Sequence, residues 1–484
     1  MKVVVLTGPQ GCGKSMLMRE EAIAKPGLYL FAVPTIELAQ EQADDFRSAR
    51  PTLDVRQVHS KSGGRGAVKR RLLEAREELE EQGARHAVLI ITHEAMMDAD
   101  LSSFEGWHAR IDEAPAAIQA GQMNIAVSRP FFESTFVLET RDNDEWALLS
   151  MAAEKPNWKA VSRDKLLGGI VEFVKQAGRD DRVFVRTPDW AADDIDWFSI
   201  WTPMALDRFA SVTIAGSAYT SSIGYRTAKD IFKEKLDFEE RPVDVKRTGD
   251  PSISIQYFTD SHQGTTTFWG KSDGRLCIKQ VCDHLADALD EGSFWSGNEV
   301  VQHLMEHRVP GVLIPPVACG INKHRERMSC AIIYSAKATK DDGPVMSIFD
   351  LSKDDIRHAR EDDAIAQFVM RGAIRNADYG GPYTIFVYEK EQAERLAMHL
   401  AKIHMPNVAV AGVPEAGLMS VKREQSMRQR SPEERAQADD DRRKSAAARM
   451  KRKRHDEAVA AGRTPGTPGN PKLRKASIQI DEAD

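Results

Sequence analysis

Cysteine is scarce in this sequence, with five residues in 484. Cys277 and Cys282 are separated by four residues, and no second pair stands at a spacing typical of metal ligands. A low and odd count does not form a disulfide framework, and free thiols persist in reducing compartments. The sequence therefore predicts a reduced, cytoplasmic protein without structural zinc.

Long apolar runs are also absent. No uninterrupted stretch approaches the roughly 18 residues that a membrane-spanning helix needs, so we expect no membrane partner. The first residues pass directly into an apolar, β-branched run and a glycine-rich segment, unlike a secretory signal or a transit peptide. The overall composition, 42% hydrophobic and 29% charged, is that of an ordinary globular protein.

Charge is unevenly distributed along the chain. The net charge is −6, but residues 421–484 hold 17 Lys and Arg against 11 Asp and Glu, so this end is basic and the rest is acidic. Residues 413–484 are poor in aromatic and β-branched side chains, and we expect a largely disordered tail. A basic tail favours an anionic partner, most simply nucleic acid, although a purely solubilising tail has the same composition.

The chain before the tail is predicted to be an α/β protein with parallel sheets, because strand-like runs alternate with helical stretches. We expect a first domain at 1–230, a charged linker at 231–250 and a second domain at 251–412. Residues of about 116–210 hold several tryptophans and interrupt the alternation, which predicts an insertion in the first domain. Strands are expected near 2–7, 28–33, 87–92, 107–111, 211–216, 253–258, 311–314, 331–335 and 383–388.

The most informative segment is Gly8-Pro9-Gln10-Gly11-Cys12-Gly13-Lys14-Ser15, which has the form G-x-x-x-x-G-K-[ST] of a phosphate-binding loop. A strand-like run precedes it and helix-forming residues follow it. Glycines let backbone N–H groups surround phosphate oxygens, and the helix N-terminus adds partial positive charge. We predict ATP binding at Gly8, Gly11, Cys12, Gly13, Lys14 and Ser15, with Lys14 at the β- and γ-phosphates and Ser15 ligating Mg²⁺.

A pair of acids, Asp112 and Glu113, ends a strand-like run about 100 residues after this loop. ATP hydrolysis needs one carboxylate that holds Mg²⁺ and another that polarises the attacking water. Asp112 is the candidate for the first task, and Glu113 is the candidate general base. Acid pairs are common, so their place at the end of a strand supports this prediction more than their identity does.

Six segments, taken in order, resemble the motifs of superfamily 2 helicases. They are residues 29–42 (motif Ia), 90–95 (the threonine motif before motif II), 112–115 (motif II), 216–220 (motif III), 319–322 (motif V) and 367–375 (motif VI). The resemblance covers roughly residues 1–400. It implies two RecA-like domains with parallel sheets and with ATP in the cleft between them.

The sequence departs from the standard DEAD-box pattern. It shows no adenine-recognising Q motif before the first strand, and its fourth box residue is Pro115. About 100 residues separate Glu113 from Ser217, where compact family members have far fewer. The resemblance thus implies a divergent member of bacteriophage or viral type, placed in the host cytoplasm if it is phage-encoded.

Motif VI places Gln367, Arg371 and Arg375 four residues apart, a spacing that predicts one shared helix face. From a second domain, this helix could bring both arginines to the γ-phosphate as arginine fingers. We therefore count all three residues as catalytic candidates. The alternative is a solvated basic edge of a helix.

Contacts with nucleic acid are predicted at two strand ends of the first domain, at Pro34-Thr35 and at Thr92-His93. A hydroxyl and free N–H groups where a strand passes into a helix suit a backbone phosphate. The alternatives are a helix cap for Thr35, and a capping or core role for Thr92 and His93.

Together these features predict an ATP-dependent helicase or translocase that uses ATP and Mg²⁺ and acts on nucleic acid. The resemblance, rather than any residue, favours DNA over RNA, with replication or recombination as the context and replication proteins as possible partners. Two other classes remain open. One is a terminase-like DNA-packaging ATPase, and the other is a P-loop ATPase that remodels a protein complex without unwinding.

Overall fold

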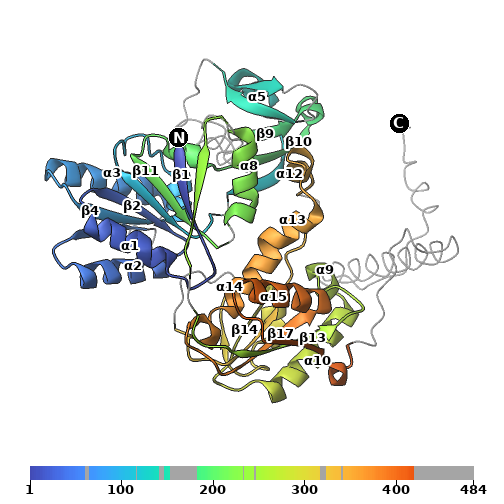
Figure 1. Cartoon of the computed structure of the whole chain (residues 1–484). Coiled ribbons are helices and arrows are strands. Elements are labelled where there is room, and N and C mark those ends of the chain that lie inside the picture. The colour runs from blue at the N-terminus through green and yellow to red at the C-terminus, as the bar shows by residue number, and fades with distance from the viewer. Residues whose placement is uncertain are drawn as a thin grey trace, which may run out of the picture. The chain divides into compact units, whose positions relative to one another are not determined.

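The computed structural model describes residues 1–59, 65–115, 117–140, 146–152, 183–217, 219–232, 234–244, 247–316, 323–339 and 342–418. The motif predicted at 319–322 and almost all of the predicted tail lie outside these ranges. Within them the chain forms two parallel sheets and one antiparallel sheet (Figure 1). This confirms the predicted α/β class, with two parallel-sheet domains of the RecA-like type.

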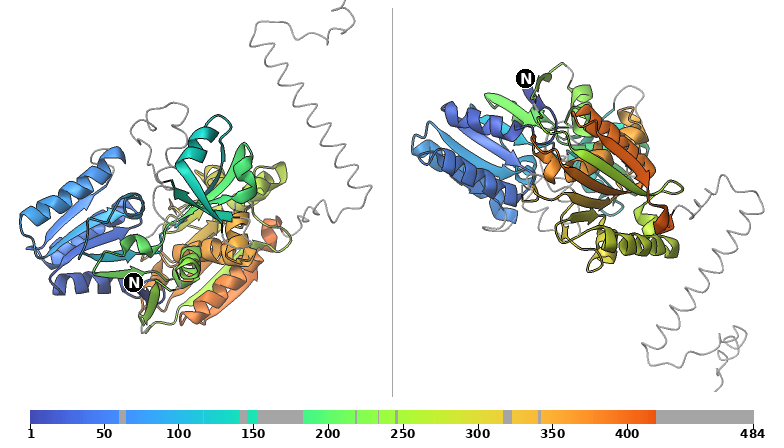
Figure 2. Two further views of the ribbon diagram at one scale, coloured as in Figure 1. Left: turned by 90° about the horizontal axis from the view of Figure 1, so that it is seen from above. Right: turned by 60° about the horizontal axis from the view of Figure 1, so that its bottom comes forward.

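The first parallel sheet has the strand order β12-β1-β11-β5-β2-β4-β3. Its strands are β1 (Lys2–Thr7), β2 (Leu28–Val33), β3 (Asp54–Val58), β4 (Ala87–Thr92), β5 (His108–Asp112), β11 (Ser211–Ala215) and β12 (Asp237–Pro242). The associated helices are α1 (Lys14–Ala24), α2 (Ile36–Ala49), α3 (Arg65–Glu81), α4 (His93–Asp98) and α8 (Ile223–Ile231). Leu30 of β2 belongs to one hydrophobic core and Phe31 to another, so both faces of this sheet are covered (Figure 2).

The second parallel sheet has the strand order β15-β14-β16-β17-β13-β18. Its strands are β13 (Ser252–Thr259), β14 (Phe294–Gly297), β15 (Val312–Leu313), β16 (Ser329–Ile333), β17 (Pro382–Glu389) and β18 (Val408–Gly412). Its helices are α9 (Thr266–Trp269), α10 (Ser272–Ala288), α11 (Glu299–Met305), α14 (Asp363–Val369) and α15 (Lys390–Lys402). Ile385 and Phe386 of β17 likewise belong to separate cores, which places the sheet between two layers.

The antiparallel sheet lies in the chain between β5 and β11, which are neighbours in the first sheet. Its order is β6-β10-β9-β8-β7. The strands are β6 (Ile118–Asn124), β7 (Phe136–Thr140), β8 (Trp146–Met151), β9 (Val183–Arg186) and β10 (Asp194–Ile200). The chain therefore leaves the first sheet after β5 and returns to it at β11. We call this unit the insertion sheet; α5 (Arg129–Thr135) packs on one of its faces (Figure 2).

The charged segment 231–250 contains a strand that the sequence did not predict. Residues Asp237–Pro242 form β12, which pairs in parallel with β1 at the edge of the first sheet. Phe232 and Leu236, just before it, are buried in the core of that sheet. The connection to β13 thus begins at Val243 rather than at 231. Among the described residues, no helix is both long and apolar enough to cross a membrane.

Candidate nucleotide-binding site

The glycine loop joins β1 to α1, as its sequence predicted. Gly8, Gly11 and Gly13 have φ angles of 140°, 81° and 92°, in the region that L side chains rarely adopt. A Cβ on Gly8 would lie 2.4 Å from the carbonyl oxygen of Val243, so no side chain fits there. Gly13 is the N-cap of α1, which directs the amino end of an 11-residue helix at the loop. This geometry fits phosphate binding.

Lys14 extends into the loop itself. Its Nζ donates hydrogen bonds to the carbonyl oxygens of Gly8 and Pro9, both at 2.8 Å, and lies 3.4 Å from the Sγ of Cys12. The side chain is buried, so its charge is held in a site of low dielectric. An ammonium group at the centre of the loop is placed to attract a polyphosphate.

Ser15 and Asp112 meet although 97 positions separate them. The Oγ of Ser15 donates a 2.6 Å hydrogen bond to Oδ1 of Asp112. A hydroxyl and a carboxylate are the oxygen donors that Mg²⁺ prefers, and the ion commonly takes one or two carboxylates together with substrate phosphates. The pair therefore fits the predicted Mg²⁺ site; the ion would neutralise charge on bound phosphates. Burial, with the nearby charge of Glu113, raises the pKa of Asp112 to about 7.

Glu113 has a backbone conformation unusual for a non-glycine residue, with φ at 67°. Its N–H donates a 2.6 Å hydrogen bond to the carbonyl of Ala215 at the end of the neighbouring strand β11. Strained backbone of this kind costs about 1–3 kcal/mol and concentrates at functional sites. The turn thus separates the side chain of Glu113 from the strand direction of Asp112, in line with different tasks for the two acids.

His93 forms a hydrogen bond with the backbone of the acid pair at the end of β5. Its Nε2 donates a 2.9 Å hydrogen bond to the carbonyl oxygen of Asp112, and its side chain is buried. Burial lowers the pKa of His93 to about 4, so the imidazole is neutral at physiological pH. The structure therefore gives His93 the core role that was its alternative, and leaves its ring little surface for nucleic acid.

The two predicted threonines cap helices. Thr35 accepts a 3.1 Å hydrogen bond from the N–H of Leu38 at the start of α2, and Thr92 accepts one of 3.3 Å from Ala95 at the start of α4. Pro34 and Thr35 are half-buried at the end of β2. The capping alternative is thus confirmed for both threonines, and their contact with nucleic acid stays a prediction.

The prediction of one helix carrying Gln367, Arg371 and Arg375 is wrong. Helix α14 ends at Val369, Arg371 lies in a turn, and Arg375 closes a 3₁₀ turn, Ala373–Arg375. Met370, which follows the helix, has φ −73° and ψ 9°, and Gly372 then takes φ −81° and ψ −166°, an extended conformation. The spacing of four residues suggested a helix, but tertiary packing around Gly372 overrides it.

A stability prediction follows at Gly372. A Cβ there would lie 2.1 Å from Oη of Tyr383, which is fully buried and donates a hydrogen bond to the carbonyl of Val369. We expect Gly372→Ala to lower the free energy of unfolding by about 1–3 kcal/mol, the range for overpacking. Urea unfolding followed by circular dichroism measures this. Gly343→Ala, where a Cβ meets nothing within 4 Å, is the matched control; equal stabilities of the two variants would contradict the packing account.

Arg375 nevertheless reaches the glycine loop. A Cβ built on Gly11 would lie 3.0 Å from Cγ of Arg375, so the arginine stem rests against the loop. Burial, with the charge of Arg371 next, lowers the pKa of Arg375 to about 10, and the group stays cationic at neutral pH. Its Nε is buried and has no hydrogen-bond partner within the described part of the chain. An unsatisfied buried donor costs about 1–3 kcal/mol, which an anionic ligand would offset.

Asp363 is a site residue that the sequence did not single out. It opens α14 and accepts a 2.9 Å hydrogen bond from Nε2 of Gln367, one turn later. Burial, and then the charge of Glu113, raise the pKa of Asp363 to about 7, while Lys14 acts in the opposite direction. The charges of Glu113 and Lys14 thus both act on Asp363, which Gln367 holds through its hydrogen bond. Asp363 stands four residues before Gln367, and this spacing is the one sequence signal that could have indicated Asp363 as a site residue.

Two motif resemblances gain little from the structure. Residues 319–322 lie outside the described ranges, and only part of 216–220 is described. In that part, Ser217 follows β11, and its Oγ is buried without a hydrogen-bond partner among the described residues.

The position of Cys12 in the glycine loop predicts that a thiol reagent inhibits ATP hydrolysis. Alkylation of its Sγ, 3.4 Å from Nζ of Lys14, would fill the loop, so we expect a partial loss of ATP hydrolysis that bound ATP prevents. Burial raises the pKa of Cys282 to about 11 and of Cys330 to about 12, which slows their reaction. The measurement is the hydrolysis rate after iodoacetamide treatment, with Cys12→Ala as control. An unchanged rate at complete Cys12 modification would refute the prediction.

No protein-family model and no curated protein sequence matches the chain. Among solved structures it is similar to Xpd4 of S. tokodaii, at 10% identity, with 84% of this chain and 95% of that chain covered and a TM-score of 0.44. It is also similar to a variant of S. cerevisiae Dbp5 bound to RNA and ADP BeF3, at 10% identity, with 85% of each chain covered and a TM-score of 0.34. It is similar as well to a DEAD box protein from Methanococcus jannaschii, at 9% identity, with 85% of this chain and 88% of that chain covered and a TM-score of 0.27. Such values identify no family, so the fold follows from the strand order of the two parallel sheets.

Proposed function

We propose that this chain is an ATP-dependent nucleic-acid helicase or translocase of superfamily 2 type. One observation carries the proposal: Arg375, which follows β16 and α14 in the second domain, rests against Gly11 of the glycine loop about 360 residues earlier. The candidate site thus combines a phosphate loop and acid pair from one domain with an arginine from the other. A simple phosphotransferase does not require this division.

The division assigns a task to each group. Lys14 would hold the β- and γ-phosphates, Ser15 and Asp112 would hold Mg²⁺, and Glu113 would orient the attacking water. Arg371 and Arg375 would neutralise charge that develops on the γ-phosphate. Because residues of both domains are needed, hydrolysis and product release change what holds the domains together. That coupling is what converts a chemical step into movement along a strand.

DNA is the preferred substrate, with replication or recombination as the context. The support for DNA is the resemblance of the motifs; the basic composition of residues 421–484 suits DNA and RNA alike. Pro34-Thr35 and Thr92 stand at the carboxyl ends of β2 and β4, adjacent strands of one sheet, where they could contact successive backbone phosphates. The terminase-like and remodelling alternatives lack a comparable observation.

The test is the rate of ATP hydrolysis without nucleic acid and with single-stranded DNA, duplex DNA or RNA. We expect single-stranded DNA to raise the rate at least about tenfold, and Lys14→Ala to abolish it, because the loop lysine holds the phosphates. Lys25→Ala, on an exposed lysine just after α1, is the matched control and should keep the wild-type rate. Hydrolysis indifferent to every polynucleotide would contradict the helicase proposal. Stronger stimulation by RNA would overturn the preference for DNA.

A further inference from the structure

A hydrophobic cluster joins the insertion sheet to a distant segment of the chain. This segment, residues 343–357, lies between β16 and α14 and forms α12 (Gly343–Ile348) and α13 (Lys353–Arg357). We call the shared core the bridge cluster. Its buried members are Trp146, Phe184, Phe198 and Ile200 of the insertion sheet and Val345, Leu351 and Ile356 of the distant segment.

Aromatic contacts define the centre of the bridge cluster. Phe184 and Phe198 stack with ring centroids 4.8 Å apart, and Phe349 meets both edge-on, at 6.4 and 6.3 Å. Phe198 and Ile356 have no exposed surface. Full burial of side chains of this size contributes about 1.5–3 kcal/mol each, so the contact is strong enough to hold the two parts as one body.

The strand pattern of the insertion sheet fits this partner. In β9, Val183 and Val185 point to the core that contains α5, whereas Phe184 points to the bridge cluster. The sheet is therefore apolar on both faces, and its own helix covers only one of them. Figure 1 shows α12 beside β9 and β10. The buried cluster that joins them contains Phe184 and Phe198 of the sheet and Val345 of α12.

An ion pair adds a directed contact next to the bridge cluster. Nη1 of Arg226, on α8 of the first domain, donates a 2.6 Å hydrogen bond to Oδ1 of Asp355 on α13. Asp355 also accepts hydrogen bonds from the N–H and the Oγ of Ser352, and its own N–H donates to that Oγ, so Ser352 caps the start of α13. Hydrogen bonds from Ser352, and then from Arg226, lower the pKa of Asp355 to about 2. The carboxylate is thus charged throughout the physiological range.

The far end of α13 leads directly to the candidate ATP site. The backbone continues through a π-helical turn, His358–Asp362, into α14, which carries Asp363 and Gln367. Single π turns inside helices are rare and recur at functional sites. The path from the bridge cluster to the nucleotide-facing residues is therefore one continuous helical rod, residues 353–369.

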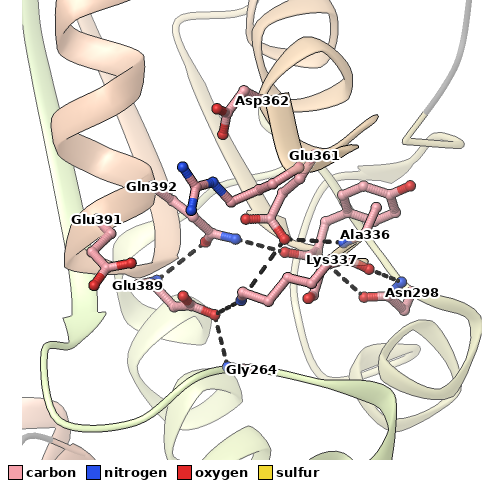
Figure 3. A network of polar contacts seen from close by, with 12 residues as sticks. Gly264, Asn298, Ala336, Lys337, Glu361, Asp362, Glu389, Glu391 and Gln392 are labelled. Atoms are coloured by element: carbon pink, nitrogen blue, oxygen red, sulfur yellow. Dashed lines mark hydrogen bonds and ion pairs between the residues drawn. The ribbon is translucent and has the colours of Figure 1, made fainter. Parts of the chain in front are cut away.

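Buried charges anchor the π turn to the second sheet (Figure 3). Glu361, which is fully buried, accepts hydrogen bonds from the N–H of Ala336 at 3.0 Å and from Nη2 of Arg395 at 3.2 Å. Nζ of Lys337 lies 3.8 Å from Glu361 and also pairs with Glu389, as Figure 3 shows. Breaking a buried pair on one side costs about 3–5 kcal/mol, so the turn does not readily give way.

We propose that residues 343–369 form a positioning element through which the insertion sheet sets the placement of Gln367, Arg371 and Arg375. The proposal rests on the proposed ATPase function. Phe349, Ile356 and Asp355 touch no reacting atom; they act through α14. A displacement of the insertion sheet moves α13 through the bridge cluster, and the anchored π turn passes that movement to α14 instead of absorbing it.

The experiment compares Phe349→Ala and Arg226→Ala with wild type in two measurements. Hydrogen exchange of the α14 amides, residues 363–369, reports the rod directly, and we expect at least tenfold faster exchange. For ATP hydrolysis we expect kcat to fall about tenfold with KM within about twofold, because neither substitution changes the glycine loop or Lys14, which hold the phosphates. Arg226→Lys should restore most of kcat, since it keeps the charge that faces Asp355.

The controls lie on the same insertion sheet. Val137→Ala removes a half-exposed side chain of β7, and Arg129→Ala breaks an ion pair with Asp193 inside the unit. Both should leave exchange in α14 and kcat unchanged. If Phe349→Ala does not fold, Phe349→Leu, which keeps most of the apolar volume, replaces it as the test of the contact with the insertion sheet, and Arg226→Ala tests the contact with α8 separately.

Two outcomes overturn the proposal. One is unchanged exchange in α14 in the folded variants, and the other is faster exchange with an unchanged kcat. If the wild-type protein does not hydrolyse ATP, the proposed function is wrong. The exchange measurement would still decide whether the insertion sheet holds α14 in place.

Discussion

Replacing Glu113 by Gln is expected to lower kcat for ATP hydrolysis by about 10²–10⁴-fold, the range for loss of a general base, while ATP affinity changes little. The side chain keeps its shape but no longer polarises the attacking water. The site geometry supports this assignment. Asp112 accepts a 2.6 Å hydrogen bond from Ser15 at the predicted Mg²⁺ site, whereas the backbone turns away from the strand direction at Glu113, whose φ is 67°.

The electrostatics of the site separate this effect from unfolding. After burial, the charge of Glu113 is the next largest cause of the raised pKa of both Asp112 and Asp363. Removing that charge relieves repulsion among three carboxylates, so we expect Glu113→Gln to be at least as stable as the native chain. A lower midpoint of thermal unfolding would contradict the electrostatic account.

Glu113→Gly provides the matched variant. It also removes the carboxylate, and in addition it suits the left-handed backbone conformation, which strains a residue with a Cβ. We expect it to be as inactive as Glu113→Gln and more stable. Measuring kcat, the affinity for ATP and the thermal midpoint for both variants tests these expectations. A Glu113→Gln protein with near wild-type kcat would assign the general base elsewhere, with Asp363 as the next carboxylate in place.

The local half of the site could be predicted from the sequence, because its geometry is encoded in contiguous residues. A β-branched run, glycines at fixed offsets and Lys14-Ser15 specify the strand, the loop and the start of α1, and the structure has all three at those positions. Asp112 was found in the same way, since acids that end a parallel strand share an edge with the loop that ends another. Each of these predictions needed only residues that are adjacent in the sequence.

The parts that the sequence concealed depend on contacts between distant residues. Strand β12 carries Glu239, which pairs with Arg241 of the same strand and with Lys2 of β1 at the exposed edge of the sheet, so no apolar alternation marks it. Gly372 packs against Tyr383 on β17, and the partner of the insertion sheet lies more than a hundred residues away. Periodicity reports which face of an element is apolar, but not what covers it.

Simultaneous replacement of Arg371 and Arg375 by Ala is expected to lower kcat about 10³-fold, within the range observed when an arginine finger is lost. ATP affinity should fall far less, because Lys14 and the glycine loop remain. Arg371 is buried, and its positive charge contributes to the lowered pKa of Arg375. Each alone should therefore have an intermediate effect, since the neighbour supplies part of the positive charge.

Arg275→Ala, which removes an exposed arginine on α10, is the control for charge loss in the second domain. The separation of kcat from binding is the decisive readout. A group that contacts the γ-phosphate only as charge develops lowers kcat alone, whereas a group that holds ATP in the ground state lowers affinity by the same factor. Because the structure places Arg375 against Gly11 through its stem and leaves its Nε without a partner among the described residues, we expect the first pattern. Equal losses in both quantities would make the two arginines part of the binding site rather than fingers.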